Sequence, residues 1–358
     1  MVVITRVLFL GLAYAAAWLL APTAGPLREG FFEIWVQWDA AHFLEVARFG
    51  YTDPSTDPHA TAFFPLFPLL VRGVEAVGFP LVAGAMAINT VASVVAAAYL
   101  FRLADDEIGE ESGRRALVYL LLFPTTVFLI APYSEALFLA GTIPAFYYAR
   151  RGRWPLVAAP AAVACASRAA GLFVVAGLAF EFLRQRDFTA RRWRVAVGSL
   201  VVGLLPVAAF AAYLAHIQGD PFYFFVDQRE GWHRALVGPL DALRNTWELT
   251  TSNASPTNWI LTWRLELVAA LIGLGLLVWT LARREWGYAA FTGSMMAALL
   301  TSTWYFSIPR MLLTLFPLIL GMAAFTARRS GRHEIVIAVM APLAALGVIV
   351  YTQGAWFY

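Results

Sequence analysis

The sequence predicts an all-α polytopic membrane protein, and three observations support this fold class. Hydrophobic residues make up 60% of the 358 residues and charged residues only 14%, whereas a soluble domain has about 25% charged residues. The mean hydropathy is +0.67. Apolar stretches near the length that crosses a bilayer, about 20 residues, recur along the whole chain. Residues 1–358 are therefore treated as one transmembrane domain.

Ten apolar stretches are candidate membrane spans, and an eleventh is interrupted. The ten are 4–21, 61–79, 81–101, 116–132, 135–149, 195–215, 265–282, 287–305, 310–327 and 334–351. The stretch 155–183 is too long for one span and is interrupted at 167–171, so we expect two shorter helices that meet there. The first stretch lacks a small-residue cleavage site and is expected to remain as a helix. The total is about 10–12 transmembrane helices, with long non-spanning segments at 22–60 and 216–262.

The distribution of arginine predicts the orientation of these spans. Short basic loops are expected on the cytoplasmic side, and four of them are found at 150–153, 184–194, 283–284 and 328–332. This assignment places 22–60, 216–262 and the approach to Arg310 on the extracytoplasmic side. If both 61–79 and 81–101 crossed fully, every later loop would change sides. One of the two is therefore expected not to cross, and the prolines of 64–68 suit a re-entrant or interfacial stretch.

The first outer segment contains a carboxylate in an unusual setting. Asp39 lies within Trp35-Val36-Gln37-Trp38-Asp39-Ala40-Ala41-His42, beside a membrane-length apolar run, where a charged group is costly and marks a functional site by default. On a helix over 31–48, positions 35, 39, 42 and 46 would share one face. Such a helix would lie along the membrane surface with Phe31, Phe32 and Ile34 in lipid. Alternatively, the tryptophans form an ordinary aromatic belt and the polar side chains face water.

Two arginines are candidate anion ligands. Arg168 interrupts an apolar stretch and needs an anionic partner, for which Glu135 and a bound phosphate are the candidates. Arg310 opens a span at the expected outer face, where snorkelling toward the headgroups is the alternative interpretation. The aromatic and charged segment 216–262 either closes over a substrate or forms an amphipathic cover. Both alternatives remain open from the sequence.

No cofactor is expected from the sequence. Asp39, Asp53, Asp57, His42 and His59 share the first outer segment and could hold a divalent ion, but their spacing matches no fixed ligand pattern. The acidic run at 105–111 is interpreted as a solvated surface. Cys165 is the sole cysteine, which excludes an intrachain disulfide and a cysteine metal site. Nothing in the sequence indicates nucleic-acid binding.

Several short motifs together resemble a known family. They are Gln37–Leu44, Gly50-Tyr51, Ala62–Pro68, Pro132–Phe138, Ser167–Gly171, and Arg310 followed by Phe316-Pro317. In order and spacing the sequence resembles a bacterial relative of PIG-V, the second mannosyltransferase of glycosylphosphatidylinositol assembly. PIG-V belongs to the GT-C membrane glycosyltransferases. The resemblance covers most of the chain.

The resemblance implies a GT-C-like fold and a glycosyltransferase of the cell membrane. It implies a polyprenyl-phosphate sugar donor with mannose as the sugar, a lipid or glycan acceptor, and inverting transfer at the extracytoplasmic face. Asp39 matches the catalytic position, and Arg168 and Arg310 would bind the donor phosphate. Substrate contacts are expected from Trp35, Gln37, Trp38, His42, His59, Tyr133 and Glu135, with no metal. Two other functions remain possible: a transporter or flippase of lipid-linked glycans, and a catalytically silent transferase subunit.

Overall fold

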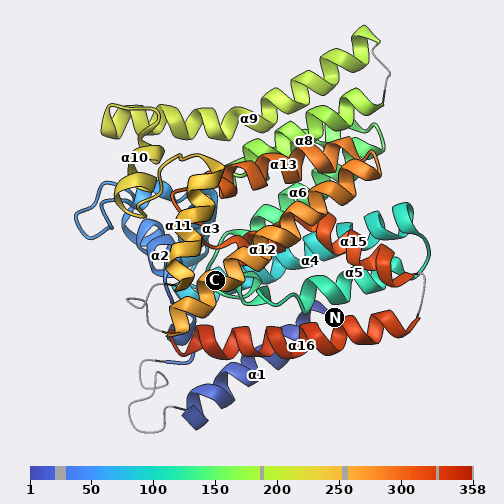
Figure 1. Ribbon diagram of the computed structural model, residues 1–358. Helices are drawn as coiled ribbons and strands as arrows, with labels where there is room; N and C mark the ends of the chain where they lie inside the picture. The colour runs from blue at the N-terminus through green and yellow to red at the C-terminus, as the bar shows by residue number, and fades with distance from the viewer. Residues whose placement is uncertain (21–29, 186–188, 252–256, 328–329, 357–358) are drawn as a thin grey trace. The chain divides into compact units, whose positions relative to one another are not determined.

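The computed structural model is all-helical, which confirms the predicted fold class. It describes residues 1–20, 30–185, 189–251, 257–327 and 330–356. Within these ranges the chain forms sixteen α-helices and a few short 3₁₀ turns (Figure 1). Extended pairing in the described ranges is limited to an isolated bridge between Leu236 and Ser302.

The helices group into two compact units. The first contains Met1–Pro144 and Ile319–Phe357, and the second contains Ala145–Leu318. The chain passes between units within two helices, α6 (Glu135–Arg150) and α15 (Phe316–Ala327). The interpretation of 1–358 as a single domain stays a prediction, and each unit is described by itself below.

The first unit places a short surface helix beside long apolar helices. Its complete helices are α1 (Val2–Leu20), α2 (Asp39–Phe49), α3 (Leu66–Ala76), α4 (Leu81–Ile108), α5 (Ser112–Leu121) and α16 (Ser330–Thr352). Helix α1 packs against α16, and α3 packs against both α2 and α4 (Figure 1). The Arg72 side chain of α3 donates to the carbonyl oxygens of Ala47 and Val46, over 2.6 and 3.2 Å. The Val46 carbonyl also accepts the backbone N–H of Gly50 at 2.9 Å, so Arg72 and Gly50 together fix the C-terminal end of α2, where carbonyls lack partners within the helix.

The second unit is built around two pairs of packed helices. Its complete helices are α7 (Ala158–Ser167), α8 (Gly171–Arg184), α9 (Ala190–Gln218), α10 (Tyr223–Glu230), α11 (Pro239–Thr251), α12 (Thr257–Ala282), α13 (Trp286–Leu300) and α14 (Ile308–Thr314). Helix α8 packs along α13, and α7 packs along α9 (Figure 1). Gly287 lies so close to α8 that an added Cβ would be 2.8 Å from a carboxylate oxygen of Glu181. The small residue permits the close approach of the two helices.

Five described helices are long and apolar enough to cross a membrane: α1, α4, α9, α12 and α16. The pair α14 and α15, bent by 74°, raises the number to six if it forms one broken span. These are fewer than the 10–12 spans expected, because several predicted spans contain shorter helices. Pro124 follows the end of α5 within the predicted span 116–132, where it cannot donate a backbone hydrogen bond.

Helix α3 explains the conflict in the predicted orientation. It has 11 residues, so at 1.5 Å per residue it is about 16 Å long, roughly half of the hydrocarbon thickness. Helix α4 has 28 residues and is long and apolar enough to cross a membrane. The stretch 61–79 is therefore the one that is too short to cross as a regular helix.

The interruption at 167–171 is confirmed. Helix α7 ends at Ser167, Arg168 has an extended backbone with φ −160° and ψ 151°, and α8 begins at Gly171. A Cβ added at Gly171 would lie 2.4 Å from the Cα of Cys165. The sharp return of the chain after Arg168 therefore requires glycine at this position.

Candidate active site

Asp39 is the first residue of helix α2 and follows a strained backbone position. Trp38 has φ 56° and ψ −126°, a region that residues other than glycine rarely adopt. Such outliers persist only where the surroundings enforce them, and they cluster at functional sites. The Asp39 side chain is half-buried. Its place in the first turn is favourable for a carboxylate because the N-terminal end of a helix carries partial positive charge.

The expected helix over 31–48 is wrong over residues 31–38. Glu33–Trp35 forms a 3₁₀ turn, and the α-helix begins only at Asp39. Trp35 is fully buried and therefore does not extend the face that Asp39 and His42 share. Ile34 is also buried rather than lipid-facing, whereas Phe32 is 42% exposed. The change of direction at Trp38 separates the turn from the helix.

Two tyrosine hydroxyls hold the backbone just before Asp39. The Tyr351 hydroxyl donates to the carbonyl oxygen of Trp35 at 3.0 Å. The Tyr133 hydroxyl donates to the carbonyl oxygen of Gln37 at 2.9 Å, and Tyr351 also reaches this oxygen at 3.3 Å. Both tyrosines are buried. We call Tyr133, Tyr351 and these two carbonyl groups the tyrosine clamp.

The tyrosine clamp changes the interpretation of two predicted substrate contacts. The Tyr133 hydroxyl, which was expected to contact substrate, bonds to the backbone, and the Gln37 carbonyl accepts that bond. The Gln37 amide donates to the carbonyl oxygen of Ile34 over 3.4 Å. Tyr351 was missed because it lies more than 300 residues from Asp39, so local spacing in the sequence contained no signal for it.

Trp38 and the two histidines of the first outer segment have distinct surroundings. The Trp38 ring is 41% exposed and meets Trp356 edge to face, with 4.9 Å between centroids. The His42 ring stacks on Phe63 at 5.1 Å. The backbone N–H of His59 donates to a carboxylate oxygen of Asp57 at 2.7 Å. The Trp38 indole is thus partly exposed, and the predicted contacts of Trp38, His42 and His59 with substrate stay predictions.

His42 faces two carboxylates. Its Nδ1 atom is 3.8 Å from a carboxylate oxygen of Glu45 and 3.9 Å from one of Asp57. These separations exceed a direct hydrogen bond. Among the residues that the structure describes, no three histidine, cysteine or acidic side chains are grouped so that they could hold a metal ion.

Glu135 begins helix α6 and is completely buried. An acidic residue in the first turn is stabilised by the helix N-terminus. Asn89 fixes the chain just before this turn, because its amide donates to the carbonyl oxygens of Ala131 and Tyr133 at 2.5 and 2.9 Å. The burial of Glu135 fits a role in supporting the Tyr133 turn, and its predicted contact with substrate stays a prediction.

In the second unit the structure brings Arg168 beside helix α14, which carries Arg310. The Arg168 guanidinium is 3.7 Å from the sulfur of Met311, the residue after Arg310. Arg168 is half-buried, and Arg310 is 5% exposed. Arg310 is thus not an exposed snorkelling side chain. The two predicted anion ligands lie in one neighbourhood of the second unit.

A buried carboxylate that sequence reasoning missed fixes the start of α14. Glu266 of α12 is fully buried and accepts the backbone N–H groups of Ser307 and Ile308 at 2.6 and 2.8 Å. Ser307, the residue before α14, has φ 64°. The sequence contained a signal for this residue, because Glu266 is the one acidic residue of the candidate span Trp259–Ala282. A charged side chain is costly within a membrane span and therefore needs a partner, which is the argument already applied to Arg168.

The segment 216–262 packs, in its described part, on the residues that lead into α14. The Asn245 amide donates to the carbonyl oxygen of Thr303 at 2.8 Å, and the Arg234 guanidinium lies 5.4 Å from the Phe306 ring centroid. The backbone N–H of Tyr305 donates to the Thr246 hydroxyl at 2.8 Å. The described part of the segment therefore covers the approach to Arg310, and whether it also closes over a substrate stays a prediction.

The predicted residues thus form two groups. Asp39, His42, His59, Tyr133 and Glu135 belong to the first unit, with Trp35, Gln37 and Trp38, while Arg168 and Arg310 belong to the second. Their convergence on one cavity stays a prediction.

Comparison with protein families gives one match over most of the chain. The profile described as Mannosyltransferase (PIG-V) matches residues 23–237. The mouse protein GPI alpha-1,6-mannosyltransferase 2 is 38% identical over 149 residues, covering 37% of this chain and 29% of that protein. The GPI mannosyltransferase 2 of Yarrowia lipolytica is 28% identical over 150 residues, covering 41% of this chain and 40% of that protein. The matched regions thus span less than half the length of these relatives.

Two solved structures share the fold at low sequence identity. ArnT from Cupriavidus metallidurans, crystallised with undecaprenyl phosphate, aligns with a TM-score of 0.56 and 16% identity, covering 97% of this chain and 74% of that one. The Archaeoglobus fulgidus oligosaccharyltransferase aligns with a TM-score of 0.50 and 12% identity, covering 99% of this chain and 56% of that chain. Both are membrane glycosyltransferases of the GT-C fold, so the expected fold is confirmed.

The contact between Glu266 and α14 leads to a stability prediction. Changing Glu266→Ala should lower the unfolding midpoint in detergent, because two buried backbone N–H groups lose their acceptor at a cost of about 1–3 kcal/mol each. The control is Glu248→Ala, whose side chain is 61% exposed and pairs with an exposed Arg244. Equal midpoints for the two variants would show that Glu266 does not hold α14.

Proposed function

Because the chain belongs to the PIG-V mannosyltransferase family, we propose that it is a membrane glycosyltransferase that transfers mannose from a polyprenyl-phosphate donor to a lipid or glycan acceptor. The observation that carries this proposal is the placement of Asp39. A half-buried carboxylate begins a helix after a strained residue, and the backbone before it is held by two tyrosines. Enzymes fix a reacting group in this way because misplacement is costly in rate.

The proposed reaction needs one base and one stabilised leaving group. The acceptor hydroxyl oxygen attacks the anomeric carbon of mannose as its proton passes to Asp39. The bond from that carbon to the phosphate oxygen breaks, and polyprenyl phosphate leaves with the electron pair. Attack opposite the leaving group inverts the anomeric configuration. The proton balance requires a single carboxylate acting as general base.

Arg168 and Arg310 are the proposed ligands of the donor phosphate. Their support is their proximity within the second unit, through the Met311 contact, and the burial of Arg310. A guanidinium binds a phosphate with paired hydrogen bonds and stabilises negative charge on the leaving group. The undecaprenyl phosphate bound to ArnT, a protein of the same fold, supports this donor class.

The proposed mechanism makes a prediction for Asp39. Changing Asp39→Asn should lower turnover by about 10²–10⁴-fold, the usual contribution of a general base, and leave donor binding unchanged. Glu110→Gln, an exposed carboxylate of the α4–α5 connection in the same unit, is the isosteric control. Product formation from polyprenyl-phosphate mannose, followed by mass spectrometry, is the measurement. Near-normal turnover in Asp39→Asn would refute the assignment.

A second prediction concerns the two arginines. Alanine at whichever residue binds phosphate should weaken donor binding about ten- to hundred-fold, because a charge-assisted hydrogen bond contributes about 1.5–3 kcal/mol. Donor binding to purified Arg168→Ala and Arg310→Ala should be compared with that of Arg283→Ala, an exposed arginine lying 5.2 Å from the Trp279 ring. If neither variant binds donor more weakly than the control, the proposed phosphate site is wrong.

We also propose that the reaction requires no metal. Two guanidinium groups provide the positive charge that a divalent ion would otherwise supply to a phosphate. Activity should therefore persist in excess EDTA. Loss of turnover on chelation, with recovery on adding manganese or magnesium, would contradict this and direct attention to Asp39, His42 and His59.

The proposed location of the reaction is the extracytoplasmic face of the cell membrane. Its support is the set of arginine-rich loops, which are expected in the cytoplasm. A membrane-impermeant thiol reagent added outside should label Asp57→Cys and leave Arg153→Cys unlabelled. The native Cys165 is buried and provides the background control. Labelling of the Arg153 variant alone would reverse the orientation.

A further inference from the structure

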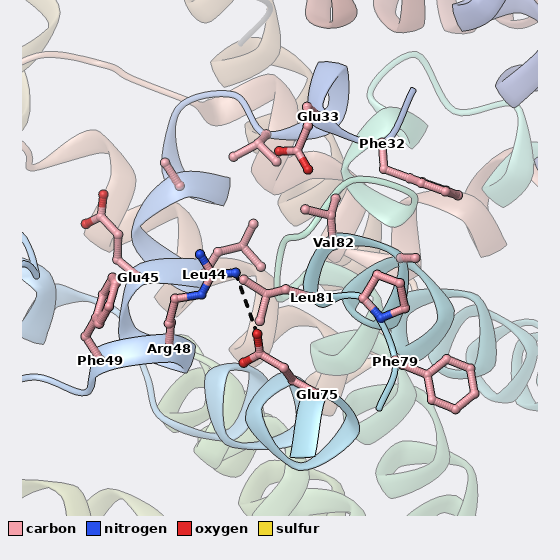
Figure 2. A pocket seen from close by; sticks show the side chains of 14 residues that line it. Phe32, Glu33, Leu44, Glu45, Arg48, Phe49, Glu75, Phe79, Leu81 and Val82 are labelled. Atoms are coloured by element: carbon pink, nitrogen blue, oxygen red, sulfur yellow. Dashed lines mark ion pairs between the residues drawn. The ribbon is translucent and has the colours of Figure 1, made fainter. Parts of the chain in front are cut away.

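A groove lies beside α2, and Asp39, the proposed base, is not among the residues that line it. Its volume is about 580 Å³, and its lining comes from α2, the end of α3 and the first turn of α4, together with the turn before α2 (Figure 2). All of these elements belong to the first unit. His42 is not among its lining residues either. The glycosyl transfer proposed above leaves this groove without a role.

Part of the groove wall is apolar, and it includes the first turn of a candidate membrane span. Leu44 of α2 faces Leu81 and Val82 of α4 across it (Figure 2). Phe32 and Phe79 lie at one end and are 42% and 58% exposed. Because α4 is a candidate span that begins at Leu81, we expect this end of the groove at the level where the chain enters the hydrocarbon. Exposed rings at that level suit contact with acyl chains.

The charges in the groove are mixed and mainly negative. Glu33, Glu45 and Glu75 line it together with one cation, Arg48. The Arg48 guanidinium is 3.6 Å from a carboxylate oxygen of Glu75 and remains 54% exposed. Three carboxylates against one guanidinium repel a purely anionic headgroup, including the phosphate of a polyprenyl donor.

Glu33 is the carboxylate most open to a ligand. It points into the groove from the turn before α2, opposite the Arg48–Glu75 pair (Figure 2). Within the described ranges its side chain takes part in no hydrogen bond or ion pair with the protein. The groove thus offers a carboxylate for a cation and an exposed guanidinium for an anion, beside apolar walls.

We propose that this groove binds one phospholipid with a primary-amine headgroup, of the phosphatidylethanolamine class. The ammonium group pairs with Glu33, with Glu45 adding negative potential, and the phosphate lies against Arg48. The acyl chains run along Phe32 and Phe79 into the bilayer. A choline headgroup has no N–H to donate to a carboxylate, and a glycerol headgroup has no cation. The site is independent of the proposed glycosyl transfer.

The test is lipid retention on the purified full-length chain. The protein in detergent is mixed with equal amounts of phosphatidylethanolamine, phosphatidylcholine and phosphatidylglycerol of identical acyl chains, and bound lipid is counted by native mass spectrometry. Phosphatidylethanolamine should be retained about two- to five-fold over the other two, as expected for a partly exposed ion pair. Glu33→Gln should remove the preference over phosphatidylcholine. Arg48→Gln should weaken retention of phosphatidylethanolamine and of phosphatidylcholine.

Glu110→Gln is the matched control and should keep the wild-type pattern, since this exposed residue lies outside the groove. Equal retention of the three lipids by the wild-type chain would overturn the proposal without reference to any variant. Preferential retention of phosphatidylglycerol, or an unchanged preference in Glu33→Gln, would overturn it equally. Unfolding midpoints of the variants, measured in the same detergent, show whether each one is folded.

Discussion

The position of Asp39 depends on hydrogen bonds from two tyrosine hydroxyls to backbone carbonyls. A helix starting at residue 31 would satisfy the carbonyls of Trp35 and Gln37 internally. In the structure Tyr351 and Tyr133 donate to them instead. The chain can then change direction at Trp38, in a conformation that costs of order 1–3 kcal/mol, and begin α2 with Asp39. The clamp is buried, so water does not compete for these bonds.

In the second unit a carboxylate, rather than a hydroxyl, satisfies backbone groups at the start of a helix. The chain must enter α14 after Ser307, whose φ is 64°, and Glu266 accepts the two N–H groups there. In both units a buried side chain from a distant helix satisfies the backbone at a break, and a candidate functional residue follows within a few positions. A candidate base and a candidate phosphate ligand are each placed by this means.

Sequence reasoning succeeded where a residue conflicted with its immediate surroundings. Arg168 within an apolar stretch marked the break between α7 and α8, and the structure confirms it. The prolines of 64–68 marked a stretch that does not form a long helix. Both signals are local, because they arise from charge or from a missing backbone donor within a few residues. The motifs around Asp39 are likewise local in the sequence, and they identified the family.

The errors arose where tertiary contacts override local pattern. The spacing of Trp35, Asp39 and His42 suits a helix, but that pattern cannot reveal a hydroxyl from residue 351 that binds the backbone at 35. The resemblance placed Tyr133 at the substrate and could not reveal that its hydroxyl also holds the backbone at Gln37; its contact with substrate stays a prediction. Glu266 fell at the edge of a predicted span and was missed, although its burial in an apolar helix makes it the structural partner of α14.

The central claim is that the tyrosine clamp positions Asp39 for transfer, and Tyr351→Phe tests it most directly. The substitution removes one hydroxyl and leaves the ring, so the packing of Tyr351 against Trp35, with centroids 6.4 Å apart, is preserved. Steady-state turnover and donor binding should be measured beside Tyr14→Phe, an exposed tyrosine of α1. The account predicts a fall in turnover of about tenfold or more, since a shift of about 1 Å at a reacting group can cost about 100-fold, with donor binding unchanged. Wild-type turnover in a folded Tyr351→Phe protein would contradict it.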